Sequence, residues 1–181
     1  MSRVVLVGGG VRCGKSRFAL QLARAWPGPR TFLATAEVRD GEMRERAAQH
    51  RLERGGDFET LEEPLDLYGA LVRLEERVVV VDCITLWLSN LLLQQASGAD
   101  VLAAVDAVCG LLVRRAPPCV LVTNEVGMGI VPETPLGRAF RDLAGAAHQR
   151  LARAADEVYF GALGMMLRLK PAPVAAVEVA R

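Results

Sequence analysis

The sequence predicts an α/β protein, in which a mostly parallel β-sheet is covered by helices on both faces. Three short apolar runs, at residues 4–7, 78–81 and 119–123, are typical of strands that are buried on both faces. Segments with helical periodicity separate these runs along the chain. This alternation favours parallel pairing, because each helix carries the chain back across the sheet.

The other elements are expected in the same alternating order. Further strands are predicted at residues 31–36 and 157–163. Helices are predicted after residue 16, at 41–54, after Pro64 within 62–76, and at 84–95, 101–115 and 136–154. The tail at residues 171–181 is either an edge strand or a frayed end. The 181 residues fit a single domain that spans residues 1–181.

Composition and charge disfavour several classes of protein. Apolar residues make up 51% of the chain, but no apolar run reaches the roughly 18 residues of a membrane-spanning helix. The N-terminus lacks the pattern of a signal peptide, so a cytoplasmic location is expected. The net charge is +1 and only two lysines are present, which does not favour nucleic-acid binding. The four cysteines form no CxxC pair and are expected to be buried, reduced thiols.

A phosphate-binding motif follows the first apolar run. Residues 9–16 match G-x-x-x-x-G-K-S/T, with a predicted strand before the motif and a helix after it. The motif is the P-loop of P-loop NTPases, whose backbone N–H groups and helix N-terminus bind phosphate oxygens. Lys15 is expected to reach the β- and γ-phosphates, and Ser16 to bind Mg²⁺. The predicted nucleotide-binding residues of the loop are Gly9, Gly10, Val11, Arg12, Cys13, Gly14, Lys15 and Ser16.

Two carboxylates stand at the ends of predicted strands. Asp82 ends the four-valine strand, where a P-loop protein can hold Mg²⁺ through water; the alternative is a cap on the helix that follows. Glu125 ends the strand at residues 120–123 in the same manner. Ligands of open parallel sheets collect at the carboxyl ends of strands. Glu125 is therefore a candidate ligand of metal or substrate, and the alternative is a structural role in the glycine-rich loop.

The chain contains two histidines, His50 and His148. On the predicted helix at 41–54, His50 shares a face with Arg46 and Arg54, which lie four residues away on either side. The arginines disfavour protonation of the imidazole and attract phosphate, so His50 is placed to attack an α-phosphate. A solvated polar face is the alternative, because glutamates lie on the same helix. His148 reads as a surface or partner-facing histidine without a chemical role.

The ordered set of motifs resembles one enzyme family, over residues 4 to about 170. The marks beyond the P-loop are residues 40–43, His50, Arg51, Arg54, Glu62, Pro64, residues 82–88, Asn90, residues 123–133, Arg138, residues 140–142 and Gly145. This set is similar to that of the bifunctional adenosylcobinamide kinase/adenosylcobinamide-phosphate guanylyltransferases of cobalamin biosynthesis. A P-loop alone is widespread, whereas the stretch at 123–133 is specific to this family.

The resemblance implies two reactions. A nucleoside triphosphate, ATP or GTP, phosphorylates the hydroxyl of the aminopropanol arm of adenosylcobinamide. GTP then transfers GMP to that phosphate through a histidine–GMP intermediate, giving adenosyl-GDP-cobinamide, and the matching histidine is His50. The catalytic residues are then His50 and Lys15, with Glu125 as the candidate base for the corrinoid hydroxyl. The resemblance also places Thr35, Arg51, Glu62 and Asp82 at the guanine nucleotide.

The same resemblance implies a RecA-like fold and a homotrimer, with nucleotide bound near the subunit boundaries. Three features depart from the family pattern. His148 stands where the family usually has Asn, Met165 and Met166 replace a small residue and Pro, and the tail at 171–181 extends past the common end. The departures bear on the corrinoid contacts and on the C-terminal packing.

Three other functions are compatible with a P-loop. A single-activity small-molecule kinase would use the P-loop without His50. A guanine-nucleotide switch is disfavoured, because the chain has no N-K-x-D box and no D-x-x-G spacing after Asp82. A RecA-like nucleic-acid motor is disfavoured by the short chain and by the lack of a basic stripe.

Overall fold

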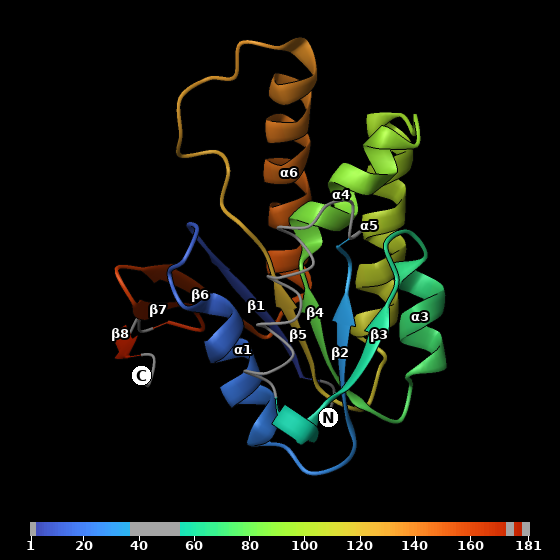
Figure 1. Ribbon diagram of the computed structural model, residues 1–181, viewed down its shortest axis with the longest axis vertical. Helices are drawn as coiled ribbons and strands as arrows, with labels where there is room; N and C mark the ends of the chain where they lie inside the picture. The colour runs from blue at the N-terminus through green and yellow to red at the C-terminus, as the bar shows by residue number, and fades with distance from the viewer. Residues whose placement is uncertain (1–2, 37–54, 173–175, 179–181) are drawn as a thin grey trace.

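A sheet of eight strands forms the centre of the computed structural model (Figure 1). The structure describes residues 3–36, 55–172 and 176–178. The strands are β1 (Val4–Gly9), β2 (Arg30–Ala34), β3 (Glu59–Glu62), β4 (Val78–Asp82), β5 (Cys119–Val122), β6 (Glu157–Ala162), β7 (Met165–Lys170) and β8 (Ala176–Glu178). The helices are α1 (Lys15–Arg24), α3 (Leu67–Arg73), α4 (Ile84–Leu93), α5 (Gly98–Leu112) and α6 (Pro135–Ala154), with a 3₁₀ turn at Gly55–Asp57.

The sheet is parallel except at one edge. The strand order is β3-β2-β4-β5-β1-β6-β7-β8. Neighbouring strands from β3 to β6 pair in parallel, whereas β6–β7 and β7–β8 pair antiparallel. The expectation of a mostly parallel sheet is therefore confirmed. Of the two alternatives for the C-terminal tail, the edge strand is the one seen at residues 176–178.

Two strands, β3 and β7, were not predicted from the sequence. β3 is an edge strand that begins and ends with glutamate, so it lacks the apolar run that marks the inner strands. β7 follows β6 through a turn at Leu163 and Gly164, whose φ angles are 54° and 80°. Two successive positive φ angles are typical of tight hairpins. The predicted strand at 157–163 therefore continues into a hairpin, and its last residue belongs to the turn.

Helices cover both faces of the sheet, as predicted. On one face, Phe18 and Ala19 of α1 share a buried core with Val5 and Val7 of β1. On the other face, residues of α3, α4, α5 and α6 enclose a larger core that contains Leu6. Figure 1 shows α1 standing apart from the group α3 to α6. Because successive side chains of a strand point to opposite faces, β1 contributes to both cores.

The four valines of β4 are 0–3% exposed, which confirms the prediction of a strand buried on both faces. Each fully buried valine stabilises the fold by about 1.5–3 kcal/mol relative to an exposed one. Among the residues that the structure describes, no helix combines the length and the apolar character that crossing a bilayer requires.

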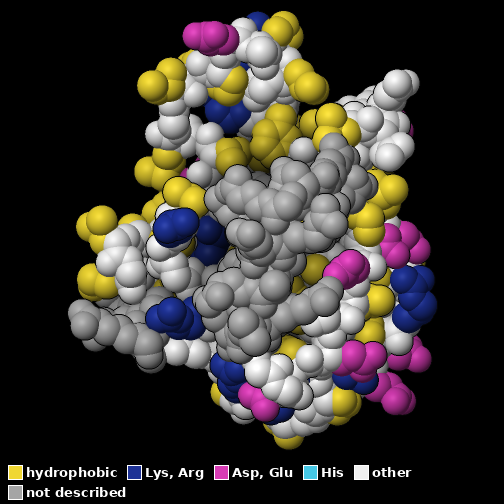
Figure 2. Space-filling model, in the orientation of Figure 1, with side chains coloured by type: hydrophobic (Ala, Val, Ile, Leu, Met, Phe, Trp, Pro, Cys, Tyr) yellow, Lys and Arg dark blue, Asp and Glu magenta, His cyan; other side chains and the backbone are white. Residues whose placement is uncertain are grey.

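The loop between β5 and α6 projects away from the sheet together with the start of α6 (Figure 1). Figure 2 shows hydrophobic side chains on this projecting part. The large exposed ones are Met128, Ile130, Val131 and Leu136. Much of the family-specific stretch at 123–133 is thus apolar surface, and packing in the core does not explain its residue types.

Arg115 joins two loops at the amino-terminal ends of inner strands, on the side of the sheet away from the P-loop. The residue is 5% exposed, and burial lowers the pKa of its guanidinium. The guanidinium donates to the carbonyl oxygens of Leu74, of Arg77 at 2.5 Å and of Pro117 at 3.0 Å. These carbonyls lie in the turn before β4 and in the loop before β5. Arg115 therefore provides the hydrogen-bond donors that water would otherwise supply to these carbonyl groups, which precede two inner strands.

We expect Arg115→Met to lower the free energy of unfolding by about 2–4 kcal/mol, because it removes the hydrogen bonds of the guanidinium to several part-buried carbonyl groups. Urea denaturation of the purified variant measures the change. Arg114→Met is the matched control: Arg114 is exposed, so its loss should change stability by no more than about 0.5 kcal/mol. Equal effects of the two substitutions would contradict the role assigned to Arg115.

Candidate nucleotide site

The strand ends that can bind a ligand meet in one row at the carboxyl edge of the sheet. In the parallel ladders, Ala34 lies opposite both Glu62 and Asp82. Asp82 lies opposite Val122, and Val122 lies opposite Val7, which precedes the P-loop. The register therefore brings Glu62, Asp82 and the P-loop to the same edge, although they are far apart in sequence.

The P-loop has the backbone that its glycines predict. Gly9 has a φ of 147°, and a Cβ added there would lie 2.5 Å from the Gly161 carbonyl oxygen, so a side chain does not fit. Gly14 has a φ of 93° and is the N-cap of α1, without a side chain to bond the N–H groups of the first turn. These N–H groups, at the positive end of the helix dipole, are suited to phosphate.

Lys15 begins α1, and its side chain turns back towards the loop. Its Nζ donates to the Gly10 carbonyl oxygen at 2.8 Å, and the residue is 7% exposed. The ammonium group therefore lies against the loop that is expected to enclose the phosphates, where the lysine of a P-loop reaches the β- and γ-phosphates.

Asp82 and the P-loop lysine both act on the same buried thiol. Burial raises the pKa of the Cys83 thiol, the Asp82 carboxylate raises it further, and Lys15 acts in the opposite direction. Both charged groups are thus within electrostatic reach of one buried thiol. The N-cap of α4 is Cys83, so the structure does not support the alternative in which Asp82 is the N-cap of this helix.

The donor atoms at this edge fit Mg²⁺. A serine hydroxyl and a carboxylate are hard oxygen donors of the kind that Mg²⁺ takes, with water and phosphate oxygens completing its coordination. Ser16 in the first turn of α1 and Asp82 at the end of β4 provide them. Within the described part of the chain, no group of three His, Cys, Asp or Glu residues forms a metal cage. The donor set therefore suits an ion that arrives with the nucleotide.

Thr35 binds the backbone that follows Asp82. Its hydroxyl donates to the Cys83 carbonyl at 2.7 Å and accepts from the Cys83 N–H at 2.8 Å. Asn90 donates to the Thr35 carbonyl at 2.8 Å, and Thr35 is fully buried. The network fixes the chain on the far side of Asp82. The expectation that Thr35 contacts the nucleotide stays a prediction, to which the structure adds this positioning role.

The loop after β5 runs beside the P-loop. The Thr123 N–H donates to the Val7 carbonyl at 2.9 Å, and the Glu125 N–H donates to the Gly9 carbonyl at 3.0 Å. Glu125 Oε1 accepts from the Gly127 N–H at 2.6 Å. The structural role considered for Glu125 is therefore present. The hydrogen bond from the Glu125 N–H also keeps the backbone of this residue next to the P-loop.

His148 is not the surface histidine that the sequence suggests. Its side chain is 13% exposed, its Nε2 lies 2.7 Å from Thr123 Oγ1, and its Nδ1 lies 3.7 Å from Glu125 Oε2. Burial lowers the pKa of His148, which favours the neutral ring, while the neighbouring Glu125 acts in the opposite direction. One signal was available in the sequence: at helical spacing, His148 shares a face with Ala144 and Leu151, which are buried.

The predicted nucleophile lies outside the described residues. Residues 37–54 contain His50 and Arg51, together with Arg46 and Arg54, which were expected to share a face with His50. The roles assigned to these residues from spacing and from the family resemblance stay predictions.

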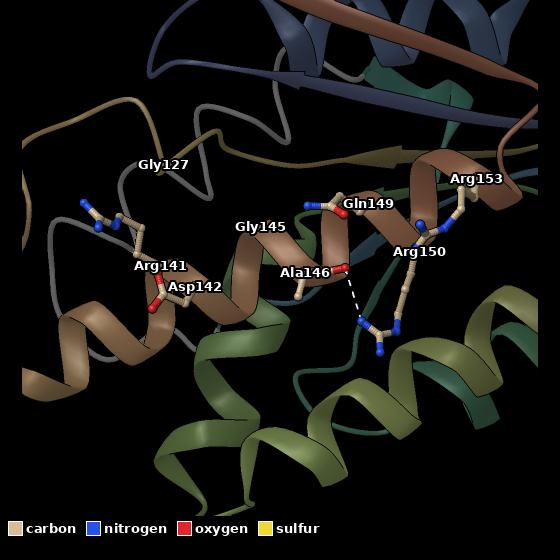
Figure 3. Close-up of a pocket in the computed structure, with 8 residues that line it drawn as sticks. All are labelled: Gly127, Arg141, Asp142, Gly145, Ala146, Gln149, Arg150 and Arg153. Atoms are coloured by element: carbon tan, nitrogen blue, oxygen red, sulfur yellow. Dashed lines mark hydrogen bonds between the residues drawn. The ribbon is translucent and has the colours of Figure 1, made fainter.

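A pocket of about 510 Å³ opens along α6, next to the loop after β5 (Figure 3). It is lined by Gly127, Arg141, Asp142, Gly145, Ala146, Gln149, Arg150 and Arg153. Arg150 turns towards α5, where its Nε lies 3.0 Å from Asp106 Oδ1. The pocket adjoins the Glu125 region, because Gly127 donates to Glu125 and Gln149 follows His148. Residue patterns did not predict it, although four of its residues (Gly127, Arg141, Asp142 and Gly145) are family marks.

Sequence comparisons show the family of the chain. Residues 5–169 match the family described as cobinamide kinase / cobinamide phosphate guanyltransferase. The bifunctional adenosylcobalamin biosynthesis protein CobP of Pseudomonas aeruginosa is 40% identical, over 93% of this chain and 98% of that protein. The bifunctional adenosylcobalamin biosynthesis protein CobU of Salmonella typhimurium is 38% identical, over 92% of this chain and 99% of that protein.

A structural comparison bears on the fold. A solved structure described as an ATPase domain has a TM-score of 0.52 with this chain at 10% sequence identity, and the match covers 97% of this chain and 80% of that one. At this identity the likeness shows the fold alone. It confirms the prediction of a RecA-like P-loop fold.

We expect Thr35→Val to lower the free energy of unfolding by about 2–4 kcal/mol, because the buried Cys83 N–H loses its acceptor and the Cys83 carbonyl loses one of its two donors. Chemical denaturation measures the loss. Thr35→Ser is the matched control, since it keeps the hydroxyl and should lose clearly less stability. A stable Thr35→Val protein with weakened GTP binding would instead indicate that the hydroxyl serves the nucleotide directly.

Proposed function

Because the chain belongs to the cobinamide kinase / cobinamide phosphate guanyltransferase family, we propose that it phosphorylates adenosylcobinamide and then transfers GMP from GTP to the product. The observation that carries the proposal is the convergence of the P-loop, Asp82 and Glu125 at one edge of the sheet. The alternative is a single-activity P-loop kinase, in which His50 has no catalytic role.

The first step is phosphoryl transfer at the P-loop, with ATP or GTP as the donor. The substrate hydroxyl oxygen bonds to the γ-phosphorus as its proton passes to the Glu125 carboxylate. The bond from the γ-phosphorus to the β–γ bridging oxygen breaks, and the nucleoside diphosphate leaves with the electron pair. Lys15 and the backbone N–H groups of the loop stabilise the charge on the phosphoryl oxygens as it shifts.

The second step is nucleotidyl transfer in two stages. A ring nitrogen of His50 bonds to the α-phosphorus of GTP, the bond to the α–β bridging oxygen breaks, and pyrophosphate leaves. A phosphate oxygen of the phosphorylated corrinoid then attacks the same phosphorus, and His50 leaves as a neutral imidazole. Two easier displacements thus replace one between two anionic phosphate compounds.

The remaining expectations for the site belong to the same proposal. Arg51, Glu62, Asp82 and Thr35 serve the guanine nucleotide, and Thr35 acts by fixing the chain beside Asp82. Ser16 and Asp82 hold Mg²⁺, which offsets the negative charge of the phosphates. A homotrimer stays a prediction that rests on the family resemblance, and a cytoplasmic location stays a prediction that rests on the pattern of the N-terminus and of the apolar runs.

We expect incubation with α-³²P-GTP and Mg²⁺ to leave an acid-labile label on the denatured wild-type protein and none on His50→Ala. The label is a phosphoramidate between histidine and GMP, which acid hydrolyses. A parallel reaction with γ-³²P-GTP should leave no such label, because the γ-phosphate departs with pyrophosphate. An unlabelled wild-type protein that still binds GTP would leave the single-activity kinase as the function. Label from the γ-phosphate would indicate a phosphoenzyme instead.

We expect Asp82→Asn to raise the Mg²⁺ concentration for half-maximal phosphoryl transfer on the order of tenfold or more, since carboxylates around a bound metal commonly contribute that much affinity. A Mg²⁺ titration at saturating nucleotide measures the shift. Glu59→Gln is the matched control, because Glu59 is an exposed carboxylate at the opposite end of β3. An unchanged requirement in Asp82→Asn would contradict the role given to this carboxylate.

A further inference from the structure

We infer that His148 is a positioning residue for Glu125, which it orients to accept the proton of the substrate hydroxyl during phosphoryl transfer. This inference rests on the proposed function, in which Glu125 is the base. It concerns a residue to which neither spacing nor the family resemblance gave a chemical role.

Two of the three residues involved have their backbone against the start of the P-loop. Backbone hydrogen bonds of 2.9 Å and 3.0 Å tie Thr123 and Glu125 to β1, at Val7 and Gly9. A Cβ added to Gly8 would lie 3.6 Å from Thr123 Cγ2, so these two segments of the backbone lie close together. A proton acceptor held here is beside the loop that is expected to hold the phosphates of the donor nucleotide.

Each oxygen of the Glu125 carboxylate faces a nitrogen from a different part of the chain. Oε1 accepts from the Gly127 N–H at 2.6 Å, and Oε2 lies 3.7 Å from Nδ1 of His148 on α6. The first contact is a hydrogen bond, whereas the second is longer than one. The backbone therefore fixes one oxygen. The other stays open to a hydroxyl proton while the ring sets the direction of the carboxylate.

Thr123 bears on which nitrogen of the His148 ring carries the proton. Nε2 of His148 lies 2.7 Å from Thr123 Oγ1, and Thr123 is 3% exposed. A neutral imidazole carries one N–H, and an ionised carboxylate only accepts, so the N–H belongs on Nδ1. Nε2 then accepts from the Thr123 hydroxyl. The chain of polar groups is thus directed: the Thr123 hydroxyl donates to His148 on α6, and the Nδ1–H of His148 points towards Glu125.

The competing interpretation is that His148 only ties α6 to β5 through Thr123. Two substitutions separate the interpretations. The Asn side-chain amide ends near the position of Nδ1, so His148→Asn keeps a donor towards Glu125 but loses the contact with the Thr123 hydroxyl. The Gln amide reaches the position of Nε2, so His148→Gln keeps the contact with Thr123 but loses the donor towards Glu125.

The test is steady-state phosphoryl transfer to adenosylcobinamide, with α-³²P-GTP labelling of each protein as a separate readout. We expect His148→Gln to lower kcat on the order of 10- to 100-fold, as loss of orientation at a reacting group does. The KM for adenosylcobinamide should stay within about twofold and the GMP label should be retained, since neither depends on the base. His148→Asn should keep kcat within about threefold of wild type.

Other outcomes would overturn the inference. Wild-type kcat in His148→Gln, or a loss confined to His148→Asn, would leave His148 as a structural tie. If His148→Gln does not fold, Thr123→Val provides a second test, because it removes the hydroxyl that orients the ring. An unchanged kcat in Thr123→Val would then reject the chain of polar groups. A folded wild-type protein that takes the GMP label but transfers no phosphoryl group would instead overturn the kinase half of the proposed function.

Discussion

The parallel register of β2, β4, β5 and β1 is the constraint on which the rest of the site depends. It sets Ala34, Asp82, Val122 and Val7 side by side, so that the segments after these strands leave the sheet at one edge. A shift of one residue in any ladder would turn the side chains that follow it to the other face. The packed cores on both faces make such a shift costly, because side chains turned to the other face would no longer fit the core that they enter.

Buried polar contacts then convert this register into fixed side-chain positions. Thr35 holds the chain beyond Asp82, and the backbone of Glu125 continues the ladder of β5 along the P-loop. Gly9 allows the loop to pass within van der Waals distance of β6. The phosphate-binding loop, the carboxylate at the end of β4 and the carboxylate after β5 are thus supported by three different strands. Rigid strands with functional loops at their ends are the usual arrangement of open α/β sheets.

α6 connects this edge to the rest of the molecule. Its inner face packs in the larger core, and its residue 148 reaches back to the end of β5. Its outer face lines the pocket, which opens beside Gly127 (Figure 3). One helix therefore contacts both the group assigned as the base and a cavity next to it. The projecting loop before α6, which contains the stretch at 123–133, carries exposed apolar side chains.

The sequence alone determined features that depend on local pattern. The P-loop was evident because its glycines, lysine and serine are consecutive, and the inner strands were evident because β1, β4 and β5 are nearly all apolar. Strands at the margin of the sheet were harder to predict. β3 is polar at both ends, and β7 depends on a hairpin turn formed by Leu163 and Gly164.

Only the tertiary structure decided which polar side chains meet. Glu62 and Asp82 flank Ala34 through pairing of strands that are distant in sequence, a relation that no local pattern records. The environment of His148 was misjudged for the same reason. The polar and charged neighbours of His148 on α6 indicate a solvent-facing residue, whereas Thr123 and Glu125, about two dozen residues earlier in the chain, enclose its ring. Periodicity reports which face of a helix is buried, but the partner of a half-buried polar group depends on how separate elements pack.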